Sequence, residues 1–171
     1  FRLCFCDFMS KKLFIQILVF SVTILIGQIF IPAFSFHNLK IVPDILIIYL
    51  TYIGFFYGRF YAIILGFIFG ITQDFITQME LLGAMAFTKS ALGFGLGTLA
   101  LYRNIWPKHI RLLFIFLMYL LHFFIYFFIK FNGVHISIPV YMQVIVIHSL
   151  LSFTILFIID KSFMKHGVTA K

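Results

Sequence analysis

The sequence predicts an all-α integral membrane protein, a bundle of six transmembrane helices with both termini in the cytoplasm. Hydrophobic residues make up 63% of the 171 positions and charged residues only 11%. The apolar residues form long runs that are separated by short polar connections, and the basic residues gather on alternate connections. In water, a surface with so few charges would be one continuous apolar patch, which excludes a soluble globular protein.

Each apolar run is expected to be long enough to cross a hydrocarbon core of about 30 Å at about 1.5 Å per residue, and the second run is the shortest. The expected helices are 13–34, 42–57, 60–78, 82–102, 111–130 and 138–160. They form one domain over 9–165, followed by a cytoplasmic tail at 166–171. Residues 1–8 precede Met9 and are interpreted as an upstream extension, and the first helix as a retained signal anchor.

Proline and glycine mark the ends of these helices. Pro43 and Pro139 lie near the start of the second and sixth helices, where the first turn has no internal partner for a backbone N–H. The pair Gly58-Arg59 predicts a tight turn between the second and third helices. Asp44 is expected one residue into the second helix, where a carboxylate suits the positive end of the helix dipole.

The positions of lysine and arginine predict the orientation of the bundle. With a cytoplasmic N-terminus only Lys40 and Lys130 face outward, and Lys89 lies within a span. The basic residues then placed inside are Arg2, Lys11, Lys12, Arg59, Arg103, Lys108, Arg111, Lys161, Lys165 and Lys171. Cytoplasmic loops carry the excess of basic residues in membrane proteins, so this bias predicts that both termini are cytoplasmic, with outer connections near 35–41, 79–81 and 131–137.

Several classes of function find no support in the sequence. The net charge of +8 is spread over short tracts between apolar runs, so we expect no nucleic-acid partner. Cys4 and Cys6 have no partners elsewhere, and no motif predicts a catalytic site, a metal or a cofactor. His122 and His148 would fit a proton relay, but a lone histidine on a membrane helix more often bonds a neighbouring carbonyl or hydroxyl.

Glycines spaced four residues apart predict close helix packing. The pairs are Gly54 with Gly58, Gly66 with Gly70, and Gly93 with Gly97, on the second, third and fourth helices. Two positions without side chains on one face allow another backbone to approach closely. We therefore expect these three helices to form a tight core, with the first, fifth and sixth offering broad apolar surfaces.

The same helices carry charges that need compensation inside a membrane. Asp74 and Lys89 continue the four-residue spacing of their own glycine stripes, which favours a direct or water-bridged pair between them. Asp44 and Gln73 join them at the outer side to complete a polar cluster. One interpretation is a structural ion pair with Asp44 as a helix cap, and the other is a pocket that binds a solute, an ion or a partner segment; the first is favoured.

The stretch 43–97 resembles the family of the bacterial rod shape-determining protein MreD. The resemblance rests on Pro43-Asp44, Gly58-Arg59, Leu82-Gly83, the glycines Gly66, Gly70, Gly93 and Gly97, and Gln73-Asp74. The remaining helices match that family only as hydrophobic spans. The family is also similar in fold to the membrane-embedded substrate-binding subunits of vitamin transporters.

This resemblance implies a non-enzymatic scaffold of the cell-elongation machinery, a multi-pass protein of the bacterial cytoplasmic (inner) membrane. Such a protein would bind the bitopic protein MreC and help to couple MreB filaments to peptidoglycan synthases, and a homodimer is compatible with it. The alternative is a small-molecule-binding subunit of a transporter, with a site near Asp44, Asp74 and Lys89 at the outer face.

Overall fold

Six helices and one short hairpin make up the fold of the described residues. The structure, a computed structural model, describes residues 11–31, 34–36, 39–77, 81–132 and 137–163. The elements, in chain order, are α1 (Lys11–Ile29), β1 (Phe34–Phe36), β2 (Leu39–Ile41), α2 (Ile45–Tyr57), α3 (Arg59–Thr77), α4 (Ala84–Leu101), α5 (Lys108–Lys130) and α6 (Ile138–Phe163). The strands β1 and β2 are antiparallel, with Phe34 opposite Ile41.

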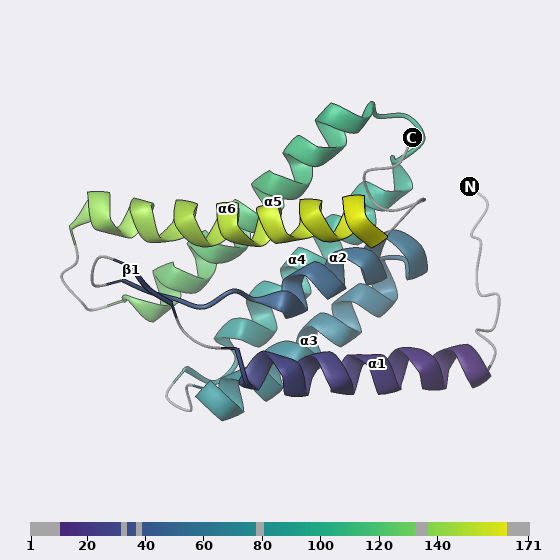
Figure 1. Cartoon of the computed structure of the whole chain (residues 1–171), viewed down its shortest axis with the longest axis horizontal. Helices are drawn as coiled ribbons and strands as arrows, with labels where there is room; N and C mark the ends of the chain where they lie inside the picture. Colours follow the sequence, from purple (N-terminus) through teal and green to yellow (C-terminus); the bar gives the residue numbers. More distant parts are fainter. Residues whose placement is uncertain (1–10, 32–33, 37–38, 78–80, 133–136, 164–171) are drawn as a thin grey trace.

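Successive helices run in opposite directions between two ends of the bundle (Figure 1). We call the end that carries β1 and β2 the hairpin end; α1, α3 and α5 finish there, and α2, α4 and α6 begin there. The opposite end is called the basic end, because it holds Arg59, Arg103, Lys108, Arg111 and Lys161 near the helix termini. The start of α1 and the finish of α6 therefore lie at the same end.

Helix α2 lies in the interior of the bundle. It has 13 residues, which corresponds to about 20 Å, and nine of them are buried. It packs against α1, α3, α4 and α6. A helix that is apolar on all sides is a buried helix, so the shortest helix serves as the centre around which the longer ones pack.

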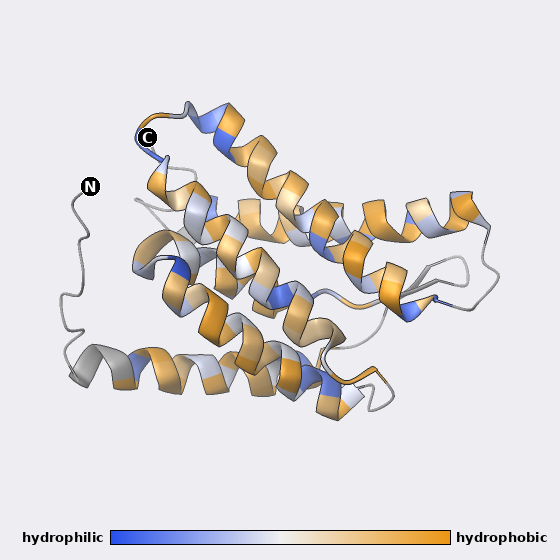
Figure 2. Ribbon diagram, turned by 180° about the vertical axis from the view of Figure 1, so that it is seen from behind, coloured by the Kyte–Doolittle hydropathy of each residue, from blue (hydrophilic) through white to orange (hydrophobic). Residues whose placement is uncertain are grey.

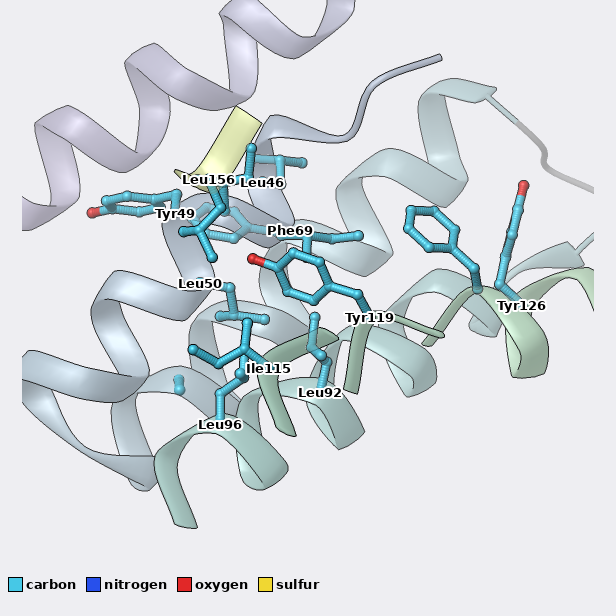
Figure 3. Packing of buried hydrophobic residues seen from close by; sticks show 14 of the residues in the cluster. Leu46, Tyr49, Leu50, Phe69, Leu92, Leu96, Ile115, Tyr119, Tyr126 and Leu156 are labelled. Atoms are coloured by element: carbon cyan, nitrogen blue, oxygen red, sulfur yellow. The ribbon is translucent and has the colours of Figure 1, made fainter. Parts of the chain in front are cut away.

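The hydrophobic core surrounds α2 and the facing sides of α4 and α5. Tyr119 is fully buried and lies in the middle of the cluster, among Leu50, Leu92 and Ile115 (Figure 3). Tyr126 lies farther along α5, toward the hairpin end. Tyr126 therefore lies at the boundary between the apolar core and the polar residues described below.

Among the described residues, four helices are long and apolar enough to cross a membrane, namely α3, α4, α5 and the part of α6 over Ile138–Lys161. The apolar parts of α1 (Ile15–Ile29) and α2 are shorter. The prediction of a helical, multi-pass membrane protein is confirmed. That all six helices cross the membrane stays a prediction.

The predicted helix boundaries need several corrections. The first helix ends at Ile29 and not at residue 34, since 34–36 form a strand. The second begins at Ile45, because Asp44 is its N-cap and lies just before the first helical residue. The fourth begins at Ala84, after Gly83 in the left-handed region at φ 97°. The fifth begins earlier, at Lys108, and the sixth extends to Phe163.

Candidate functional site: a buried polar cluster at the hairpin end

The site begins with the N-terminus of α2, which Asp44 and Gln28 hold in place. The Leu46 N–H donates to Oδ1 of Asp44 over 3.1 Å, which is the hydrogen bond of an N-cap. From α1, Gln28 Nε2 donates to the Pro43 carbonyl over 2.9 Å, and its Oε1 accepts from the Ile45 N–H at 2.8 Å. One amide therefore satisfies two backbone groups that a helix start in a membrane would otherwise leave unpaired.

Lys89 on α4 forms a salt bridge with the other oxygen of Asp44. Its Nζ lies 2.6 Å from Asp44 Oδ2 and 2.6 Å from Gln73 Oε1 on α3. The Lys89 side chain has no solvent exposure and Asp44 is 5% exposed. An ammonium group in such a place is tolerated because it is both paired and hydrogen-bonded.

Asp74 has a different role, since it caps the N-terminus of α4. Its Oδ2 accepts from the N–H groups of Gly83 at 2.9 Å, Met85 at 3.1 Å and Ala86 at 3.4 Å. The carboxylate is 1% exposed. Backbone donors at the positive end of a helix therefore compensate this charge.

The structure brings together Asp44, Gln73 and Lys89 as expected but assigns the ion pair differently. The prediction of a direct Asp74–Lys89 pair was wrong, because Lys89 is bonded to Asp44 while Asp74 is bonded to the start of its neighbouring helix. Asp44 is not merely a cap either. Its two oxygens serve α2 and Lys89 at the same time.

Close approach between α3 and α4 is what brings Gln73 and Lys89 within reach of each other. A Cβ placed on Gly66 would lie 2.6 Å from the Lys89 carbonyl oxygen, and one on Gly93 would lie 2.5 Å from the Ala62 carbonyl oxygen. Neither helix could carry a side chain there without moving. The α3–α4 interface is accordingly the most extensive in the molecule's described part.

The other predicted packing glycines extend this interface, with one exception. A Cβ on Gly70 would collide with the backbone of Ala86, and one on Gly97 with Arg59. A Cβ on Gly54 would lie 3.2 Å from the backbone nitrogen of Gly97, so α2 also packs closely against α4 at this α3–α4 seam. Gly58 is the exception: it faces open space, and its φ of 88° makes it the turn residue between α2 and α3.

Beside the ion pair lies a cavity of about 190 Å³ at the hairpin end. Polar and aromatic groups from several helices line it, including Asp44, Gln73, Thr77, Phe127, Lys130 and His148. It is partly open to the outside. The Asp44 carboxylate, which is 5% exposed, therefore borders an accessible space.

Two other polar contacts were not anticipated. Thr51 and Tyr119 share a hydrogen bond of 2.7 Å within the core, and Tyr52 donates to Asp160 over 3.2 Å. Asp160 is an acidic residue inside an apolar run and 1% exposed, a pattern that by itself indicates a partner. The prediction for lone histidines holds for His148, whose Nδ1 bonds the Val144 carbonyl at 2.8 Å.

The fold and the cluster together define a class: a multi-pass helical membrane protein whose buried charges are used for caps and an ion pair. Within the described residues, no group of three or more His, Cys, Asp or Glu could hold a metal ion. The chain belongs to the family of the rod shape-determining protein MreD, whose family model matches residues 9–166. Comparisons with curated proteins and with solved structures gave no match.

Family membership makes the chain a membrane component of the cell-shape machinery. It also confirms the resemblance seen at 43–97 and extends it over the other helices, which had matched only as hydrophobic spans. The expected likeness to vitamin-transporter subunits stays a prediction.

Proposed function

We propose that this protein is a non-enzymatic scaffold in the cytoplasmic membrane that binds MreC and helps to couple MreB filaments to peptidoglycan synthases. The observation that carries the proposal is the family match over residues 9–166. The chemistry of the cluster supports it: the oxygens of Asp44 and Asp74 accept bonds that stabilise the bundle. These carboxylates serve the architecture of a rigid scaffold.

The surface of the bundle supports an interaction within the membrane. Apolar residues cover most of the helical exterior, and hydrophilic ones gather at helix ends and at a few interior turns (Figure 2). Exposed large apolar side chains occur on every helix; Phe30, Phe60 and Phe128 are more than 60% exposed. Such surfaces are compatible with lipid, with a partner helix or with a second copy of this chain.

For the topology we propose six membrane-spanning helices with both termini in the cytoplasm. The alternation of helix direction and the collection of basic residues at one end support this orientation. The hairpin end then faces outward. Because α2 is short, the hydrocarbon core of the membrane would be crossed by α2 together with Pro43, Asp44 and the hairpin, and not by α2 alone.

The test is co-expression of the full chain with the MreC protein of the same organism, followed by purification in mild detergent through a tag on one of them. We expect the two proteins to elute together as one species in size-exclusion chromatography. An unrelated single-span membrane protein with the same tag is the control. Separate elution of the two proteins at concentrations near 10 μM would contradict the scaffold proposal, since a functional complex should be tighter than this.

A second candidate function, a small-molecule-binding transport subunit, is favoured by the cavity beside Asp44. Its volume of about 190 Å³ is smaller than the roughly 300–1,000 Å³ typical of small-molecule pockets, so we rank it second. A tightly held small molecule in the native mass spectrum of the purified protein would reverse this ranking.

A further inference from the structure

The cavity at the hairpin end combines an aromatic wall with a cation, Lys130, that none of the described residues neutralises. Its lining residues come from α1, α3, α4, α5 and α6 and from the segment that precedes α2. Its volume of about 190 Å³ is slightly larger than that of one large amino-acid side chain. The occupant is therefore small, or is the tip of something larger.

Two charged side chains line the cavity, Asp44 and Lys130, and only Asp44 has an ion-pair partner among the described residues. The Asp44 carboxylate is neutralised by Lys89 at 2.6 Å, so this pair contributes little net charge. Lys130 also lines the cavity, is half-buried, and forms no salt bridge with any of the described residues. Its Nζ lies 3.4 Å from the Tyr126 hydroxyl and 5.5 Å from the centre of the Tyr126 ring. An anion would complete this arrangement.

The neutral groups of the cavity suit a carboxylate as well. Because Gln73 Oε1 accepts from Lys89, the part of that amide left for a ligand is its NH₂ group, which is a donor. His148 is fixed by its bond to the Val144 carbonyl and packs against the rings of Phe123 and Phe127, with centroid distances of 5.5 Å and 5.1 Å. The aromatic rings can cover the methylene groups of an acidic side chain while Lys130 and Gln73 bind its oxygens.

We propose that this cavity is a socket for a single acidic side chain, Asp or Glu, carried by the partner protein next to its membrane span on the outer side. The inference rests on the proposed function, because it assumes that MreC is bound. The size of the cavity and the charge of Lys130, which none of the described residues neutralises, favour one carboxylate over a larger ligand. In the proposed topology the cavity lies toward the outer end of the bundle, where a partner's membrane helix would meet its outer segment.

The experiment measures the affinity of detergent-purified full-length chain for MreC, with Lys130 altered in three ways. Lys130→Glu should weaken binding at least about tenfold, Lys130→Gln by a smaller factor, and Lys130→Arg only slightly, as expected for the loss of a charged hydrogen bond. Lys161→Glu, at the exposed basic end of α6, is the matched charge-reversal control and should bind as the unaltered chain does. A single Asp or Glu→Lys exchange in the outer juxtamembrane segment of MreC should restore binding to the Lys130→Glu variant.

The possible results separate the socket from the scaffold proposal. If the unaltered chain binds MreC and Lys130→Glu binds equally well, the socket is wrong while the scaffold proposal stands; if the unaltered chain does not bind, both are wrong. Loss of binding by the Lys130 variants only together with a lower melting temperature would also overturn the socket. Tighter binding of MreC by the Glu80→Gln variant would also overturn the socket, because the carboxylate that occupies it would then belong to this chain. A small organic acid that is present in the mass spectrum of the unaltered chain and absent from that of Lys130→Gln would overturn it as well.

Discussion

Helices α4 and α1 are attached to the bundle in opposite ways. Helix α4 contacts α2, α3 and α5, and its buried residues include three small ones, Ala86, Gly93 and Gly97, through which backbones come together. Helix α1 packs mainly on α2, and over 15–29 its only buried side chains are the polar Ser21 and Gln28. Helix α4 is held by close backbone packing together with an ion pair and a carboxylate cap, whereas the buried contacts of α1 over this range are hydrogen bonds.

The difference follows from the membrane as a solvent. Lipid is as apolar as leucine, so a helix gains little by exchanging lipid for an apolar neighbour unless the fit is close. The fit is close at the α3–α4 seam. Between α1 and α2, in contrast, a groove of about 380 Å³ remains, lined by Phe20, Tyr49 and Tyr52 among others. We therefore expect substitutions at α4 to destabilise the fold much more than comparable ones at α1.

The largest effect is expected for Lys89→Met on α4. The change leaves the Asp44 carboxylate buried without its cation, and breaking a buried pair in this way costs about 3–5 kcal/mol. Thermal and denaturant unfolding of the purified protein in detergent measures the loss. The double variant Asp44→Asn with Lys89→Met should recover most of it, because no unpaired charge remains and asparagine still caps α2. If the single variant is as stable as the unaltered chain, the ion pair does not stabilise the fold.

A pair of glycine exchanges compares the two helix interfaces directly. Gly70→Ala should destabilise the protein by about 1–3 kcal/mol, because the new methyl group meets the backbone of Ala86, which cannot move without shifting α4. Gly27→Ala on α1 adds the same methyl group in open space and should change the stability by less than about 0.5 kcal/mol. Both variants are measured by the same unfolding experiment. Equal effects would show that the α3–α4 seam is not closely packed in the membrane protein.

How well the sequence predicts the α3–α4 seam and the polar cluster beside it depends on the residue. The spacing of Gly66, Gly70, Gly93 and Gly97 is enough to predict the seam, because a missing side chain has the same consequence wherever a helix packs. The choice of partner for Lys89 is not predictable in this way. Asp44 and Asp74 both lie near the hairpin end, and only the start of α4, where three N–H groups face Asp74, decides which one is left for the lysine.

Two further errors have clear physical reasons. Gly58 was expected both to form the turn before Arg59 and, from its four-residue spacing with Gly54, to pack against another helix. The turn is confirmed by its φ of 88°, and the packing role was wrong because a Cβ there would face open space. The hairpin was expected to be a plain connection. Its sequence alternates apolar and polar residues at 34–36 and 39–41, and this period of two was the available signal for strands.

The smallest effects test the polar contacts on either side of α2. Thr51→Val removes the hydroxyl that bonds Tyr119, a side chain with no exposure, and should cost about 1–2 kcal/mol because the tyrosine hydroxyl is left in an apolar core. Ser21→Ala removes the corresponding bond between α1 and Tyr49 at 3.1 Å, but Tyr49 still has the Ile17 carbonyl at 3.4 Å and borders an open groove. We expect a loss near 0.6 kcal/mol, the average for such bonds in membranes. Unfolding in detergent distinguishes the two, and a Ser21→Ala variant that loses as much as Thr51→Val would mean that α1 is as firmly attached as the core helices.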